Sequence, residues 1–400
     1  MLIRKAFKFE LMPTGAQVRK MQQFCGCARF VFNKALDWQN KQYEADNTTR
    51  FNYTRLANLL PEWKKAHPWL NDCHSQVLQQ SLKDLEAAFR NLFQKRADFP
   101  KFKKKGMKDS FRFPQGFKLE EDNKRVYFPK IGWVRYRKSR DVVGTIKNIT
   151  VSKRSGKWFA AMQTEYQQEQ QLPKGGEIGI DLGIVRFATL SDGTYFEPRN
   201  SLKELANQLR KAQQALSRKV KHSKNWQRAK MRISKLHYHA ANNRRDYLHQ
   251  ISTRISKNHA MVYVEDLQVA NMSKSAKGNR EHPGRKVKQK SGLNRAILDQ
   301  GWFEFRRQLD YKLAWHGGYL IAVPPKNTSR QCPDCDYISS DNRKTQADFV
   351  CGQCRFTANA DEVGAINVLR AGRAQLACEV NGAVMPSAAG TRRSELAVHH

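Results

Sequence analysis

Two cysteine pairs near the C-terminal end constrain the fold more than any other feature of the sequence. Cys332 and Cys335 form one Cys-x2-Cys pair, and Cys351 and Cys354 form a second pair after a 15-residue spacer. Two thiolates on a tight turn can bind one ion, and two such turns complete a tetrahedral zinc site. Because protein fills all four positions of that site, the spacing predicts a zinc ribbon, over residues 326–357, with a structural rather than a catalytic ion.

The charge of the chain identifies its class of partner. The 400 residues include 72 Lys and Arg against 36 Asp and Glu, a formal net charge of +36 that is spread through most of the chain. A ribosomal-type scaffold and a membrane-surface protein are weaker explanations, because only nucleic acid carries enough phosphate along so long a chain. No apolar run approaches membrane-spanning length, which predicts a cytoplasmic, nucleoid-associated protein of a prokaryote with no membrane or small-molecule partner.

Residues in several basic stretches of the chain are the predicted nucleic-acid contacts. They comprise Phe102, Lys103, Lys104, Lys105, Arg112, Lys219, Lys221, Arg244, Arg245 and Lys326. Phosphate contacts have no fixed spacing, so the sequence does not divide this set between RNA and DNA.

The N-terminal part alternates between strand and helix patterns. Residues 3–11 place apolar side chains on one face, which predicts a half-buried strand, and Thr14 with Gln17 fits a capping box that begins a helix. Helical spacing continues to about residue 95, and short alternating segments over residues 110–170 predict a β-rich region, interpreted as a small barrel. The helical block is then an insertion within that barrel.

Interleaved strands and helices after residue 174 predict an α/β domain. A second capping box, Ser201 with Glu204, is expected to begin the first of two basic helices there. The Lys- and Gly-rich segment from Ser273 to Lys290 is interpreted as a mobile cover over the active site, or else as a solvated linker. Helix is expected to resume at about Asn294.

Three acids occupy positions that need an explanation in so basic a chain. Asp181 lies in a strand pattern with small or apolar neighbours, Glu265 ends another apolar strand pattern, and Asp361 lies at the expected first turn of a helix, where the helix end favours a carboxylate. Each acid alone also fits a strand end or a helix cap. If the fold brings them together, a divalent cation would neutralise their repulsion, and bound Mg²⁺ could activate water for phosphodiester cleavage.

The same residues carry a family resemblance. Four blocks, in matching order and spacing, closely resemble the TnpB (OrfB) proteins of insertion sequences. They are Gly-Ile-Asp181-Leu-Gly with Phe-Ala-Thr-Leu-Ser-Asp-Gly, Val-Tyr-Val-Glu265-Asp-Leu, Asn-Thr-Ser-Arg-Gln-Cys332-Pro-Asp-Cys335, and Asn-Ala-Asp361 ahead of Ala365-Ile-Asn367. The resemblance covers residues 1–372. One departure is Val363-Gly364, where the family more often has asparagine-alanine.

The resemblance implies a multi-domain α+β protein, similar to compact type V CRISPR effectors. It implies a wedge-like β-barrel (1–12 and 110–170) with a helical recognition insertion (13–109), and an RNase H-like RuvC nuclease domain (174–325 and 358–372) interrupted by the zinc ribbon. Residues 373–400 are expected to form a disordered tail. In that family Asp181, Glu265 and Asp361 would be the catalytic acids and would bind Mg²⁺ or Mn²⁺.

The activity implied is RNA-guided, metal-dependent cleavage of double-stranded DNA beside a short transposon-adjacent motif, with a guide RNA derived from the transposon end. Three alternatives stay open: a nuclease-inactive RNA-guided repressor, a transposase acting on transposon ends, and an RNA-binding accessory protein. All three acids are present in the sequence, which disfavours the repressor.

Overall fold

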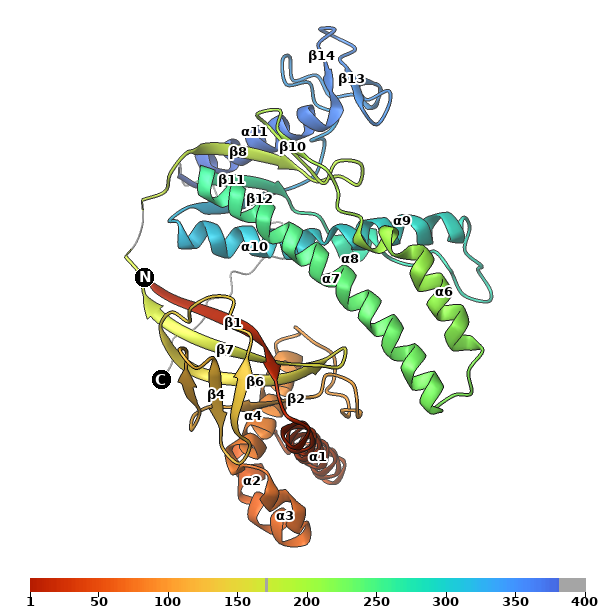
Figure 1. Cartoon of the computed structure of the whole chain (residues 1–400). Helices are drawn as coiled ribbons and strands as arrows, with labels where there is room; N and C mark the ends of the chain where they lie inside the picture. Colours follow the sequence, from red (N-terminus) through yellow and green to blue (C-terminus); the bar gives the residue numbers. More distant parts are fainter. Residues whose placement is uncertain (170–171, 381–400) are drawn as a thin grey trace. The chain divides into compact units, whose positions relative to one another are not determined.

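The structure, a computed structural model, describes residues 1–169 and 172–380 and divides into two compact units, Met1–Glu169 and Gln170–His400 (Figure 1). Each unit has its own sheet and its own apolar core. In the described part of the chain, no helix is long and apolar enough to cross a membrane.

The first unit combines a seven-stranded sheet with helices that are inserted after its first strand. Its elements are β1 (Leu2–Met12), α1 (Gly15–Ala45), α2 (Tyr53–Asn58), α3 (Leu60–Ala66), η1 (Pro68–Asp72), α4 (Ser75–Phe93), β2 (Ser110–Phe113), β3 (Lys118–Glu120), β4 (Arg125–Phe128), β5 (Gly132–Tyr136), β6 (Thr145–Arg154) and β7 (Lys157–Gln167). The strand order is β2-β6-β7-β1-β5-β4-β3. The strand β1 therefore joins strands that follow more than a hundred residues later, whereas closure of this sheet into a barrel stays a prediction.

Local sequence explains how β1 and α1 begin. Phe7, Phe9 and Leu11 alternate along β1 and are all buried in the core. The predicted capping box of α1 is confirmed: the Gln17 backbone N–H donates to Thr14 Oγ1, and the Thr14 N–H donates to Gln17 Oε1.

The second unit contains a five-stranded sheet with helices on both faces, and a small ribbon. Its elements are β8 (Gly176–Asp181), β9 (Ala188–Leu190), β10 (Tyr195–Phe196), α5 (Ser201–Glu204), α6 (Ala206–Ser217), α7 (Lys224–Asn258), β11 (His259–Glu265), α8 (Val269–Met272), α9 (Val287–Gln300), α10 (Trp302–Trp315), β12 (Tyr319–Val323), η2 (Ser340–Asn342), β13 (Asp348–Val350), β14 (Thr357–Asn359) and α11 (Ala360–Val380).

Strand directions in this sheet bring the ends of β8, β11 and β12 to one edge. The order is β10-β9-β8-β11-β12, in which β8, β11 and β12 run parallel, and β9 runs antiparallel to both β8 and β10. Along β11, Val262 and Val264 pack with residues of α7 and α10, whereas Tyr263 packs with residues of α11. The sheet therefore lies between α7 and α10 on one face and α11 on the other (Figure 1).

Close backbone contact fixes α11 against the sheet. A Cβ atom added at Gly179 of β8 would lie 2.2 Å from the Ala365 carbonyl oxygen, and one added at Gly372 of α11 would lie 1.9 Å from the Tyr263 ring. Real Cβ atoms do not approach other atoms so closely, so both positions require glycine. The helix that carries Asp361 is consequently held directly on β8.

Several local expectations are wrong. The predicted capping box at Ser201 does not form; instead the Leu202 N–H donates to the Asp299 carboxylate of α9 at 2.9 Å. Helix resumes at Val287 rather than at Asn294, so the last four residues of the expected mobile cover are helical. Finally, α11 continues to Val380, into the expected disordered tail, and the rest of that tail lies outside the described residues.

The close packing of α11 gives a matched pair of substitutions on β8. Gly179→Ala should lower the free energy of unfolding of the second unit by about 1–3 kcal/mol, because the added methyl group forces α11 away from the sheet. Gly176→Ala, on the same strand, should be nearly neutral, because an added Cβ meets no atom within 4 Å. Thermal unfolding of both variants measures the difference, and equal melting temperatures would contradict the contact.

Candidate active site and zinc ribbon

Two of the three predicted acids lie side by side at one edge of the second sheet. Asp181 is the last residue of β8, and Glu265 is the last residue of β11. These strands are parallel neighbours, and Ile180 pairs with Val264, so the next residue of each strand is an acid. The register of the sheet therefore brings Asp181 and Glu265 together although 84 residues separate them in sequence.

The third acid approaches from α11. Asp361 lies in the first turn of this helix, and Gly364 is one turn further along the same side. A Cβ atom added at Gly364 would be 3.2 Å from Cγ of Asp181, so the first turns of α11 contact that carboxylate directly. Gly364 belongs to the departure noted in the sequence, and the structure shows that the missing side chain leaves room for Asp181.

The three carboxylates interact electrostatically. Burial, together with the neighbouring carboxylates of Glu265 and Asp361, raises the pKa of Asp181 to about 8. Burial also raises the pKa of Glu265, against the opposing effects of a hydrogen bond from Thr328 and the charge of Arg343. Three ionised carboxylates are therefore unfavourable here without a compensating cation.

The donor set fits a hard divalent cation, since all three acids offer only oxygen. Among the described residues, the only group of three or more potential metal ligands whose ligand atoms all lie within 4.8 Å of one another is the four cysteines. The convergence of the three acids rests instead on the strand register of β8 with β11 and on the contact between Gly364 and Asp181.

Sequence reasoning missed the residues that hold Glu265 in place. Thr328 donates its hydroxyl hydrogen to Glu265 Oε1 at 2.6 Å. The Asn367 side-chain amide of α11 donates to the Thr328 and Gln331 carbonyl oxygens at 2.8 and 2.7 Å. Thr328 and Asn367 both lie in the sequence blocks that resemble the OrfB family, and this resemblance could have pointed to them. Helix α11 thus supplies Asp361 and also fixes the loop that orients Glu265.

Arg343 was missed as well, and it links the ribbon to the acids. It follows η2, within the segment between the two cysteine pairs, and its guanidinium donates to Asp361 Oδ1 at 3.5 Å. The same positive charge acts to lower the pKa of both Asp181 and Glu265. One cation of the ribbon therefore acts on all three acids.

The four cysteines form the predicted ribbon site. The Sγ atoms of Cys332 and Cys354 are 3.6 Å apart, as are those of Cys335 and Cys351. A tetrahedron with Zn–S bonds near 2.3 Å has S–S edges of about 3.8 Å, so the arrangement suits a structural zinc ion. Each knuckle includes a non-glycine residue with left-handed backbone: Asp336 has φ 61° and Arg355 has φ 63°.

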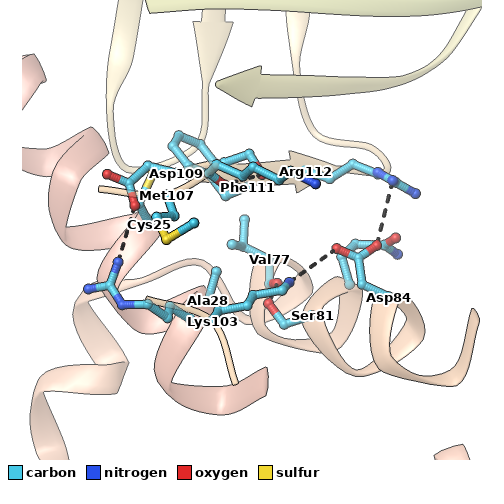
Figure 2. Close-up of a pocket in the computed structure, with 14 residues that line it drawn as sticks. Cys25, Ala28, Val77, Ser81, Asp84, Lys103, Met107, Asp109, Phe111 and Arg112 are labelled. Carbon is cyan, nitrogen blue, oxygen red and sulfur yellow. Dashed lines mark hydrogen bonds and ion pairs between the residues drawn. The ribbon is translucent and has the colours of Figure 1, made fainter. Parts of the chain in front are cut away.

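Some of the predicted nucleic-acid contacts are engaged within the protein. Lys103 and Arg112 both reach the Asp84 carboxylate of α4, at 4.0 and 3.5 Å (Figure 2). Arg244 forms an ion pair of 2.8 Å with Asp299, which is almost fully buried. The rest of the predicted set is exposed, namely Phe102, Lys104, Lys105, Lys219, Lys221, Arg245 and Lys326. Nucleic-acid contact by this set stays a prediction.

Comparison with known proteins places the chain in a family. A protein of Escherichia coli (strain K12) named as the RNA-guided DNA endonuclease InsQ is 53% identical over 377 residues, which cover 94% of each chain. The chain belongs to the OrfB (TnpB) family. A protein of Streptomyces pristinaespiralis, also named as an RNA-guided DNA endonuclease, is 30% identical over 384 residues. The match covers 94% of this chain and 91% of that protein.

Family models match three segments of this OrfB chain. Residues 161–276 match a probable transposase model of OrfB, residues 302–368 match a Cas12f1-like TNB domain, and residues 1–48 match a helix-turn-helix domain. The last description does not fit the structure, in which residues 1–48 form one strand and one continuous helix. The segment matched to the TNB domain contains the four ribbon cysteines.

A solved structure supports the fold of this OrfB protein. The Cas12f1 chain of a cryo-EM complex with sgRNA and target DNA aligns with a TM-score of 0.55 and 12% identity, covering 92% of this chain and 98% of that one. At this identity the likeness shows a shared fold, a mixed arrangement of helices and sheets.

Removal of one ribbon thiolate should release the metal. Cys332→Ser should lose the bound zinc and lower the melting temperature of the second unit, since metal binding and local folding are coupled. Cys378→Ser, a free cysteine outside the ribbon, is the matched control and should retain the metal. Elemental analysis of the purified proteins gives zinc per chain, and wild-type protein without zinc would contradict the assignment.

The raised pKa of Asp181 predicts a pH-dependent stability. Because the folded-state pKa is about 8 against an ordinary 3.8, the proton binds the folded state more tightly. The stability it contributes is fully present below about pH 4 and is lost as pH rises through about 8, by at most about 1.4 kcal/mol per pH unit. In buffer free of divalent cations, urea unfolding should show this loss for wild type and a smaller one for Asp181→Asn. Parallel pH profiles would contradict the raised pKa.

Proposed function

We propose that this OrfB protein is an RNA-guided, metal-dependent DNA endonuclease of transposon origin that cuts double-stranded DNA beside a short transposon-adjacent motif. One observation carries the proposal: Asp181, Glu265 and Asp361 come from three distant segments and converge through the strand register of β8 with β11 and the packing of α11 on β8. Two relatives named as RNA-guided DNA endonucleases, similar over more than nine-tenths of the chain, support the same activity.

The acids would hold Mg²⁺, or Mn²⁺, which supplies an activated water and neutralises the leaving oxygen of the phosphodiester. Thr328 keeps the Glu265 carboxylate in one orientation through its hydroxyl hydrogen bond. Arg343 places positive charge at Asp361, at the site where a phosphate would arrive. The raised pKa of Asp181 implies that this carboxyl releases its proton when the cation binds, because the cation favours the charged form.

The same reasoning extends to the domains. We assign residues 174–325 and 358–372 to an RNase H-like RuvC domain, residues 326–357 to the zinc ribbon, and residues 1–12 and 110–170 to a wedge-like barrel with the helical recognition insertion 13–109. The support is that β8, β11 and α11 carry the three acids and that β1 shares a sheet with β2–β7.

The partners would be a guide RNA derived from the transposon end and the duplex that pairs with it. Sequence would be read by base pairing, and the net charge of +36 would hold both phosphate backbones. This activity places the protein with the chromosome in the prokaryotic cytoplasm. A repressor without cleavage is less well supported, because it has no use for three carboxylates that repel one another.

Loss of any one acid should separate cutting from binding. Asp181→Ala, Glu265→Ala and Asp361→Ala should each reduce Mg²⁺-dependent cleavage by at least about 1000-fold, yet leave RNA binding and motif-dependent DNA binding within about threefold. Asp310→Ala, at an exposed acid of α10, is the control and should cut normally. The measurement is cleavage of a labelled duplex by the purified RNA complex, with DNA binding measured in parallel.

Two results would count against this function. Wild-type complex that binds the correct duplex and never cuts it, with either Mg²⁺ or Mn²⁺, would favour the repressor. Acid variants that cut at the wild-type rate would show that the chemistry lies elsewhere in the chain.

A further inference from the structure

A groove on the first unit combines aromatic and basic side chains and has no part in the site described above. Its volume is about 760 Å³, within the range that holds small organic ligands. The lining includes Phe30, Asn33 and Lys34 from α1, His67 and Trp69 from the segment around η1, and Phe102 from the basic run. Three segments that are distant in sequence therefore build it.

Aromatic rings on its walls remain open to solvent. The exposed fraction is 42% for Trp69 and 50% for Phe102. Trp69 is held edge-to-face against Phe30, with ring centroids 4.9 Å apart at 70°, and Phe30 packs in the same way on His67 at 4.9 Å and 78°. Large apolar rings that are fixed in place and yet exposed are typical of binding surfaces.

The loop that carries Phe102 is pinned to α1. The Asn33 side chain bonds both backbone groups of Lys103: its amide donates to the carbonyl oxygen at 3.0 Å, and its oxygen accepts from the N–H at 2.8 Å. The Lys103 ammonium lies 3.8 Å from the centre of the Phe32 ring and reaches Asp84 (Figure 2). Because its neighbour is held on both sides, Phe102 is presented at a fixed position, which reduces the entropy cost of binding.

Positive charge surrounds these rings. Lys101, Lys104 and Lys105 are exposed, and none of them forms an ion pair with an acid of the described chain. On the groove wall, the Lys34 ammonium lies 3.2 Å from Nε2 of His67, also without a carboxylate partner among the described residues. Asp37, the acid among the lining residues, is paired with Lys41 at 2.9 Å.

We propose that this groove binds an unpaired base of RNA, stacked on Trp69 and Phe102, with the flanking phosphates on the exposed lysines. Aromatic rings beside cations are the recurring platform for single-stranded nucleic acid. Duplex DNA offers no unpaired base to such a platform, whereas a folded RNA exposes bases in its loops and ends. The identification of this RNA as a guide rests on the proposed function. The stacking site itself does not depend on that function.

The salt dependence of RNA affinity distinguishes the contribution of base stacking from that of phosphate contacts. A 12-nucleotide single-stranded RNA should bind Trp69→Ala and Phe102→Ala about 5- to 100-fold more weakly than wild type, with an unchanged slope of log affinity against log salt. The double variant Lys104→Ala with Lys105→Ala should instead flatten that slope by about 1.4, since two phosphate contacts are lost. Phe93→Ala, an aromatic residue of the same unit that is 70% exposed outside the groove, is the control and should bind normally.

Ultraviolet crosslinking of the RNA-bound wild type identifies the occupant. Mass spectrometry should find RNA nucleotides attached to the peptides that contain Trp69 or Phe102. Binding that is equal in wild type, Trp69→Ala and Phe102→Ala, or an equal loss in Phe93→Ala, would overturn the proposal. Crosslinks to these peptides only after target DNA is added, and only from DNA, would also overturn it. Wild type that crosslinks RNA here but never cuts DNA would refute the nuclease function alone.

Discussion

Mutual repulsion among Asp181, Glu265 and Asp361 is the constraint on which the second unit depends. The sheet brings the first two together by parallel register, and α11 presses the third onto them through backbone contact at Gly179. Folding therefore works against electrostatics at this place, and the packing of α11 and the sheet supplies the compensating free energy. A bound cation would neutralise the three carboxylates and relieve their repulsion. The strain in the cation-free protein would then favour cation binding.

Features encoded by local pattern could be predicted from the sequence. The alternation in β1, the capping box at Thr14 and the paired cysteines are all properties of short segments, and the structure has each of them. Asp181 and Glu265 were recognisable because a carboxylate on an apolar strand is unusual in a chain of net charge +36. Their convergence required strand register and helix packing, which short-range periodicity does not specify, so it depended on the resemblance.

Contacts made over long sequence separations could not be predicted. The helix at Ser201 looked self-capped, yet its N–H group at Leu202 is bound by Asp299, about a hundred residues later. Arg343 is one of many arginines in the sequence, and only the fold of the ribbon distinguishes it. The groove of the first unit likewise joins Phe30, Trp69 and Phe102, whose spacing in sequence carries no recognisable pattern.

The ion pair between Arg343 and Asp361 has a consequence for attempts to shorten such proteins. The segment from Gln331 to Phe356, which contains all four ribbon cysteines, could be mistaken for a removable insertion, since all three acids lie outside it. Its excision would nevertheless take away Arg343, one of the two carbonyl groups that anchor Asn367, and with them the alignment of the loop at Thr328. A shortened version of the protein must therefore retain the ribbon, because Arg343 and the Gln331 carbonyl group connect it to Asp361 and Asn367 of α11.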